Sequence, residues 1–183
     1  MLGRAGVRFV VEPANIDERK VKNEQRSGGS SSEETALALA MAKARHMSAR
    51  QPDALVIGAD QILECEGEWF SKPANRQEAS QTLKKLRDRK HSLVSAVAVT
   101  LGETCLWHTV DTARLTMRPF TDDFLRRYLD ETDDEILGSV GAYRIEGMGI
   151  QLFSHIEGDH FTVLGMPFLP LLEFLRRSHM LAR

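Results

Sequence analysis

A carboxylate at the end of an apolar run is the first candidate for chemistry in this sequence. Asp60 follows residues 54–59, whose β-branched side chains are typical of a strand buried on both faces. Ionised aspartate is rarely buried without a partner, so we expect Asp60 to lie where this strand runs out into a cleft. Gly58 and Ala59 leave room beside it for a ligand or a metal. The alternative is that Asp60 caps a turn, and this segment alone favours neither.

Charged residues on both sides of Asp60 could share a phosphate site with it. Glu18 and Lys43 precede it in the sequence, and Lys72 and Glu146 follow it. Magnesium takes one or two carboxylates and leaves its other positions to waters and substrate phosphates, while lysines neutralise phosphate oxygens. A carboxylate near the metal can orient or deprotonate an attacking water. The alternative for each residue is an ordinary place on the surface, where such side chains are mostly found.

Other catalytic motifs are missing from the sequence. It contains no Walker-type Gly-Lys-Ser or Gly-Lys-Thr loop, no His-Glu-x-x-His, no Cys-x-x-Cys and no Gly-x-Ser-x-Gly. These absences disfavour a P-loop nucleotide site, a zinc site and a serine hydrolase.

Composition indicates one ordinary globular domain. The chain has 183 residues, of which 42% are hydrophobic and 27% charged, and its formal net charge is −2. That charge argues against nucleic acid as a partner, and no apolar stretch approaches the ~20 residues that span a bilayer, so we expect no membrane partner. The two cysteines, Cys65 and Cys105, lie far apart, which favours a reducing cytoplasm over a disulfide framework.

The elements that must position these residues alternate between helical and extended patterns. Ser31 and Glu34 form a capping box, which predicts a helix to about Ala49 that carries Lys43. Further helices are predicted over residues 76–88, 121–131 and 167–180, and strands over residues 7–11, 54–65, 68–70, 91–100 and 105–117. Residues 27–32 read as a flexible loop and residues 156–160 as a turn. This order predicts an α/β fold with a mixed central sheet, flanking helices and two lobes.

Six short blocks occur in an order that resembles the Maf family of nucleoside triphosphate pyrophosphatases, once described as septum formation inhibitors. They are Ala-Leu-Ala-Met-Ala-Lys-Ala at 38–44, Ile-Gly-Ala-Asp-Gln at 57–61, Lys-Pro at 72–73, Gly-Ala-Tyr-Arg-Ile-Glu-Gly at 141–147, Ile-Glu-Gly-Asp at 156–159 and Val-Leu-Gly-Met-Pro at 163–167. Each block alone is weak, but six in order make a specific match over nearly the whole chain.

The resemblance implies a Maf/ITPase-like fold around a nucleotide cleft. It also implies hydrolysis of a nucleoside triphosphate to the monophosphate and pyrophosphate, a divalent cation such as Mg²⁺ or Mn²⁺, and a homodimer. Asp60 matches the catalytic proton acceptor, and Glu18 matches a carboxylate associated with metal or substrate, so Glu18 and Asp60 are the expected metal residues. Lys43 and Lys72 match lysines that contact phosphates.

Two further positions match residues associated with substrate choice. Family members with Asp-Gln and Glu-Gly at these positions lean toward 7-methyl-GTP, and this chain has Gln61 and Glu146 there. A carboxylate can also accept from the N1 and N2 donors of guanine. The alternative is a dTTP or UTP pyrophosphatase.

One departure from the family lies at the N-terminus. Family members begin with a strand and a Ser-x-Ser-x-x-Arg loop that grips phosphates, whereas residues 1–7 here align with the end of the first helix. We therefore expect a single Maf-like domain over residues 1–183 without that strand and loop. This departure keeps an alternative of another class open, a nucleotide-binding regulatory protein without turnover that affects cell division.

Overall fold

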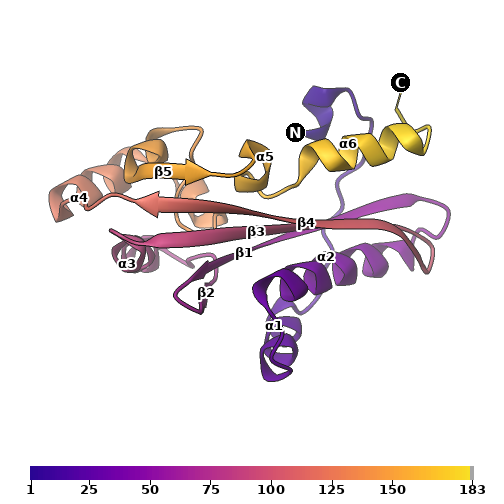
Figure 1. Cartoon of the computed structure of the whole chain (residues 1–183), viewed down its shortest axis with the longest axis horizontal. Helices are drawn as coiled ribbons and strands as arrows, with labels where there is room; N and C mark the ends of the chain where they lie inside the picture. The colour runs from indigo at the N-terminus through magenta and orange to yellow at the C-terminus, as the bar shows by residue number, and fades with distance from the viewer. Residues whose placement is uncertain (182–183) are drawn as a thin grey trace. The chain divides into compact units, whose positions relative to one another are not determined.

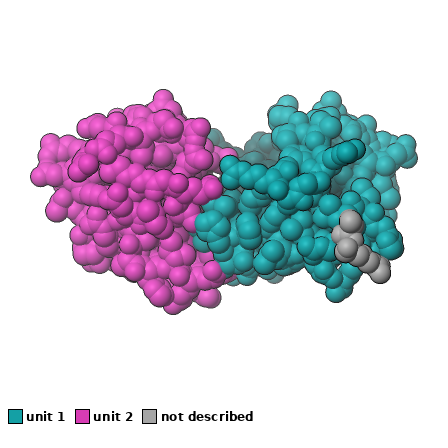
Figure 2. All heavy atoms as spheres, turned by 90° about the horizontal axis from the view of Figure 1, so that it is seen from above, with its two compact units in different colours: residues 1–60, 95–111, 159–183 teal, residues 61–94, 112–158 magenta. Residues whose placement is uncertain are grey.

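The computed structural model describes residues 1–181, and they form two compact units. Unit 1 comprises Met1–Asp60, Ser95–Asp111 and Asp159–Arg183, and unit 2 comprises Gln61–Val94 and Thr112–Gly158 (Figure 2). Each unit is described by itself below. Within residues 1–181, no helix combines the length and the apolar character that crossing a membrane requires.

A five-stranded sheet supplies the extended framework (Figure 1). Its strands are β1 (Leu55–Cys65), β2 (Glu68–Phe70), β3 (Lys90–Leu101), β4 (Thr104–Met117) and β5 (Phe153–Glu157), in the spatial order β2-β1-β3-β4-β5. The predicted strands over residues 54–65 and 68–70 are confirmed, and they pair in an antiparallel register with Leu63 opposite Phe70. The interpretation of residues 156–160 as a turn is wrong for its first part, since Ile156 of β5 pairs with Leu115 of β4.

The helices of unit 1 are η1 (Leu2–Ala5), α1 (Glu18–Ser27), α2 (Ser32–Ser48), α5 (His160–Val163) and α6 (Phe168–Arg177). The capping box of α2 is confirmed: Ser31 Oγ accepts from the Glu34 amide at 3.1 Å, and Glu34 Oε2 accepts from the Ser31 amide at 2.8 Å. The predicted strand over residues 7–11 is wrong. This segment has no regular structure, and Val10 and Val11 are 83% and 78% exposed. Their apolar side chains are not buried, so packing does not stabilise this segment as a strand.

Helices α2 and α6 cover opposite faces of the strands in unit 1 (Figure 1). On one face Leu55, Ile57 and Ala59 of β1 pack against a buried cluster formed by β3 and α6, with members Val97, Val99, Leu171 and Leu175. Successive side chains of a strand alternate between its faces, so Gly58 and Asp60 belong to the other face. There the backbone of Gly58 lies directly against Ala40 and Ala44 of α2.

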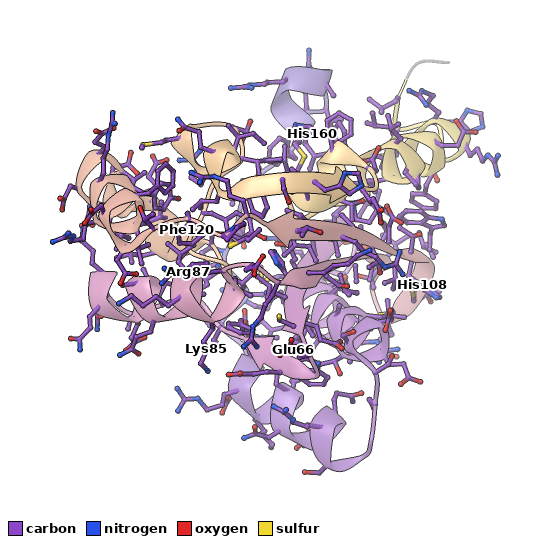
Figure 3. The ribbon with its side chains drawn as sticks, turned by 60° about the vertical axis from the view of Figure 1, so that its left-hand side comes forward. Glu66, Lys85, Arg87, His108, Phe120 and His160 are labelled. Carbon is purple, nitrogen blue, oxygen red and sulfur yellow. The ribbon has the colours of Figure 1, made fainter. Side chains whose placement is uncertain are left out.

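Unit 2 contains α3 (Arg76–Leu86), α4 (Asp122–Glu131), η2 (Asp134–Gly138) and η3 (Met148–Leu152). Leu83, Leu86, Leu125 and Tyr128 are at most 2% exposed and anchor these helices. Helix α3 ends two residues earlier than predicted, because Arg87 leaves the helical conformation. Its guanidinium instead donates to the Phe120 carbonyl at 3.0 Å and to Asp122 at 2.8 Å, and it lies over the Phe120 ring (Figure 3).

Candidate active site

Asp60 lies inside β1 and not at its end. The strand continues from Asp60 to Cys65, so both sequence interpretations of this residue, the end of a strand and the cap of a turn, are corrected. The apolar residues Ile62 and Leu63, both fully buried, extend the strand beyond the carboxylate. Asp60 is therefore fixed by an extended backbone on each side, and its side chain is only 10% exposed.

Helix α2 supplies the partner that a buried aspartate needs. Lys43 Nζ lies 2.5 Å from Asp60 Oδ1 and 2.8 Å from Glu18 Oε1, and its side chain is 20% exposed. Glu18 begins α1, which packs against α2 and is capped by Asp17, whose side chain accepts from the Lys20 amide at 2.9 Å. Lys43 is thus not on a solvated face of its helix. Three residues predicted from the sequence, Glu18, Lys43 and Asp60, meet at one ammonium group.

The electrostatics of this pair follow from its burial. Burial raises the pKa of the Asp60 carboxyl, and the hydrogen bond and charge of Lys43 only partly oppose that rise. Burial acts to lower the pKa of Lys43, but its hydrogen bonds and charge interactions with Asp60 and Glu18 outweigh burial and raise it. Lys43 therefore stays protonated, and Asp60 becomes a stronger base than an exposed aspartate.

One oxygen of Asp60 has no partner. Among residues 1–181, Asp60 Oδ2 and His91 Nδ1 are the two buried side-chain polar atoms without a hydrogen bond. An unpartnered buried carboxylate oxygen is costly, because it has lost its hydration without a replacement. Oδ2 is therefore a ready acceptor for a proton, a water or a cation that comes with a ligand.

The donor set can be compared with the needs of a divalent metal. The described residues contain no group of three or more His, Cys, Asp and Glu side chains that could hold a metal by themselves. Asp60 and Glu18 nevertheless approach the same ammonium, so these two carboxylates are neighbours. Two carboxylates completed by waters and phosphates suit Mg²⁺ or Mn²⁺, whereas a closed zinc-type site does not fit.

The remaining predicted residues belong to unit 2. Gln61 directly follows Asp60 in β1, and Lys72 is exposed in the irregular segment between β2 and α3. Glu146 lines a pocket of about 300 Å³ formed entirely by unit 2. The other lining residues are Tyr128, Glu131, Thr132, Asp133, Ile136, Arg144, Gly147, Met148 and Gly149.

The sequence interpretation missed most of this pocket. Glu131 and Asp133 also line the cavity, and the buried Tyr128 hydroxyl donates to the Ala142 carbonyl at 3.2 Å. The glycines near Glu146 are typical of turns or of close approach between the backbone and a neighbour. For Gly149 the close neighbour is backbone, since a Cβ there would lie 2.9 Å from the Arg144 nitrogen.

Comparisons with known proteins find relatives that match nearly the whole chain. A family model described as Maf-like protein matches residues 1–178. A nucleoside triphosphate pyrophosphatase of Granulibacter bethesdensis is 51% identical over 181 residues, covering 99% of this chain and 92% of the relative. The nucleoside triphosphate pyrophosphatase of Paramagnetospirillum magneticum is 47% identical, with coverages of 97% and 92%. A 7-methyl-GTP pyrophosphatase of Rhizobium meliloti is 44% identical over 176 residues, covering 96% of this chain and 88% of the relative.

Proposed function

The chain belongs to the Maf-like protein family, and on this premise we propose that it is a nucleoside triphosphate pyrophosphatase. It hydrolyses the α–β phosphoanhydride of a nucleoside triphosphate to the monophosphate and pyrophosphate. The observation that carries the proposal is the buried Asp60 carboxylate, which Lys43 holds at Oδ1 and which has no partner at Oδ2.

Asp60 is the proposed general base. Its Oδ2 accepts a proton from water, the water oxygen bonds to one phosphorus of the α–β anhydride, and the bond to the bridging oxygen breaks. The raised pKa of Asp60 supports this role, because a stronger base takes the proton more readily. Oδ2 is shielded from solvent, so binding of the substrate has to open a path for the water.

Lys43 has two proposed roles. Its ammonium fixes the Asp60 carboxylate, and it neutralises phosphate oxygens when the nucleotide is bound. Lys72 is proposed as a second phosphate contact because it is an exposed lysine before Pro73, which keeps its backbone extended. Asp60 and Glu18 are proposed to hold Mg²⁺ or Mn²⁺, which when bound polarises the phosphate oxygens.

For the nucleotide we propose 7-methyl-GTP. By the family resemblance, Gln61 and Glu146 match positions associated with substrate choice, and a relative of 44% identity is named a 7-methyl-GTP pyrophosphatase. Glu146 lines a pocket large enough for a base, and its carboxylate can accept from guanine N1 and N2. Two relatives at 51% and 47% identity carry the general name only. The family resemblance makes dTTP and UTP the competing substrates.

A nucleotide panel tests the proposal. Pyrophosphate release from 7-methyl-GTP, dTTP, UTP and CTP is measured with Mg²⁺ or Mn²⁺, after chelation with EDTA, and after metal is added back. We expect the highest kcat/KM for 7-methyl-GTP and loss of turnover in EDTA. A preference for dTTP or UTP would contradict the roles of Gln61 and Glu146. Nucleotide binding without turnover under every condition would favour the regulatory alternative.

We also propose a cytoplasmic homodimer. The family resemblance favours the dimer, and the two unpaired thiols of Cys65 and Cys105 favour a reducing compartment. Light scattering coupled to size-exclusion chromatography measures the mass directly, and a mass of 20.6 kDa at micromolar concentration would contradict the dimer.

A further inference from the structure

We propose that Gly58 is a positioning residue of this active site. Its missing side chain lets α2 approach β1 closely enough for Lys43 to contact Asp60. The inference rests on the proposed function for its catalytic meaning, but its geometric part can be measured without turnover.

Space, and not backbone conformation, explains the glycine. A Cβ at Gly58 would lie 2.7 Å from the Ala44 nitrogen and 2.9 Å from the Ala44 Cβ, and closer still to the Ala40 carbonyl oxygen. Two of these are helix backbone atoms, which cannot swing aside as a side chain can. Gly58 does not have a positive φ, so its conformation is open to any residue. A glycine inside a strand costs stability, and close approach of the helix is what compensates for it here.

The helix presents a matching surface. Ala36, Ala40 and Ala44 recur every four residues along α2 and are all fully buried. Lys43 directly precedes Ala44, so the contact that sets the helix depth lies one residue from the catalytic lysine. On the strand, Asp60 is two residues from Gly58 on the same face, about 6.6 Å along β1. The same helix-strand contact therefore controls the distance between the two charged groups.

The size of the effect follows from ordinary contact distances. Carbon atoms pack at about 3.5–4.0 Å, so a methyl group at Gly58 requires α2 to move away by about 1 Å. The Lys43–Asp60 contact is 2.5 Å, and Lys43 also bonds Glu18 at 2.8 Å, so the ammonium cannot follow Asp60 without leaving Glu18. A Gly58→Ala variant should therefore loosen the pair.

The geometric test measures the acylation rate of Lys43 by an amine-reactive ester, read by mass spectrometry. We expect several-fold faster labelling of Lys43 in Gly58→Ala, with Lys20, whose side chain is 71% exposed, as the internal standard. The matched control is Gly138→Ala, because a Cβ there meets nothing within 4 Å and its φ is not positive. Unchanged labelling in Gly58→Ala, or equal acceleration in Gly138→Ala, would overturn the proposal.

The kinetic test separates positioning from general loosening. We expect Gly58→Ala to lower kcat by about 10- to 100-fold, since a misplacement of about 1 Å can cost that much. Arginine reaches further than lysine, so Lys43→Arg should lower kcat in the native background and raise it in the Gly58→Ala background. A fall in both backgrounds would overturn the positioning role.

If Gly58→Ala does not fold, a milder variant tests whether the helix–strand contact positions Lys43. Ala44→Ser adds one atom at the same contact from the helix side, and it should accelerate Lys43 labelling to a smaller extent. No acceleration in a folded Ala44→Ser protein would overturn the proposal. If labelling responds as expected while every variant and the native protein lack turnover, the geometry stands and the proposed function fails.

Discussion

At the residue scale, Asp60 is subject to two opposing influences. Burial favours the neutral carboxylic acid, and the Lys43 ammonium favours the carboxylate. Burial dominates, so the carboxyl is more basic than an exposed aspartate while Lys43 keeps it oriented through Oδ1. A carboxylate more basic than an exposed aspartate and fixed in orientation suits the proposed role of general base.

The first prediction concerns this carboxylate. Asp60→Asn should lower pyrophosphate release by about 10²- to 10⁴-fold, the usual worth of a general base, while the fold is retained because asparagine has the same shape. Steady-state kinetics and circular dichroism measure the two effects. Asp53→Asn, at an exposed site just before β1, is the control and should behave as the native protein. Native turnover in Asp60→Asn would remove Asp60 from the mechanism.

A second residue-scale prediction concerns His91, which is 2% exposed and bonded through Nε2 to the Tyr143 hydroxyl at 2.8 Å. Burial lowers the pKa of His91 from 6.5 to about 4. The unfolded chain therefore binds the proton first, so stability is complete above about pH 6.5, falls as the pH is lowered, and is reduced by about 3 kcal/mol below about pH 4.

Urea unfolding between pH 4 and pH 7 measures this loss. His91→Leu removes the titrating group, so its free energy of unfolding should fall less steeply over this range than that of the native protein. His108→Gln changes an exposed histidine and should keep the native slope (Figure 3). Equal slopes for native protein and His91→Leu would show that His91 does not control the acid loss.

At the element scale, α2 connects the capping box at its start to Lys43 near its end. Ser31→Ala removes one hydrogen bond, from the Glu34 amide, and should lower the free energy of unfolding by about 1 kcal/mol. Lys43 lies three turns further along the helix, so kcat should not change. Urea unfolding checks the first effect, and Ser31→Asp, which keeps a capping oxygen, should restore stability. Equal destabilisation by both substitutions would contradict the capping role.

The same element marks how far the sequence could predict the fold. The capping box and the apolar run gave α2 and β1 nearly to the residue, because both are local signals. Helix α1 was not predicted: its residues are almost all polar and none is buried, so it shows no apolar stripe. Its start is stabilised by Asp17 and its position by contact with α2, and such a contact between helices leaves little trace in sequence.

The site was predictable only in part for a related reason. Their charge and the family resemblance identified Glu18, Lys43 and Asp60 as candidates. Neither the spacing nor the composition of the sequence predicts that their side chains meet. The contact depends on the depth of α2 over β1, and that depth depends on Gly58, a residue without a side chain to attract notice. The pocket around Glu146 depends in the same way on how the segments containing Tyr128, Asp133 and Gly149 fold together.

At the scale of the whole molecule, the two units have different shares of the candidate residues. Unit 1 holds Glu18, Lys43 and Asp60, and unit 2 holds Gln61, Lys72 and Glu146. Strands β1, β3 and β4 each contribute residues to both units, so each of these strands is divided between the two units. The single Maf-like domain expected over residues 1–183 stays a prediction, and the shared strands favour it, because few contacts normally cross a boundary between domains.

The division of the candidate residues between the two units predicts different kinetic effects for substitutions in each unit. Asp60→Asn, in unit 1, should lower kcat for every nucleotide by a similar factor, because the base acts on the phosphate chain that all substrates share. Glu146→Gln, in unit 2, should lower kcat/KM for 7-methyl-GTP by about 10- to 100-fold, the worth of a hydrogen bond to a charged group, and leave dTTP and UTP unchanged. Measuring all three nucleotides with each variant checks both effects, with Glu103→Gln on the exposed β3–β4 turn as control. An equal loss for all nucleotides in Glu146→Gln would mean that this carboxylate serves the chemistry and does not choose the base.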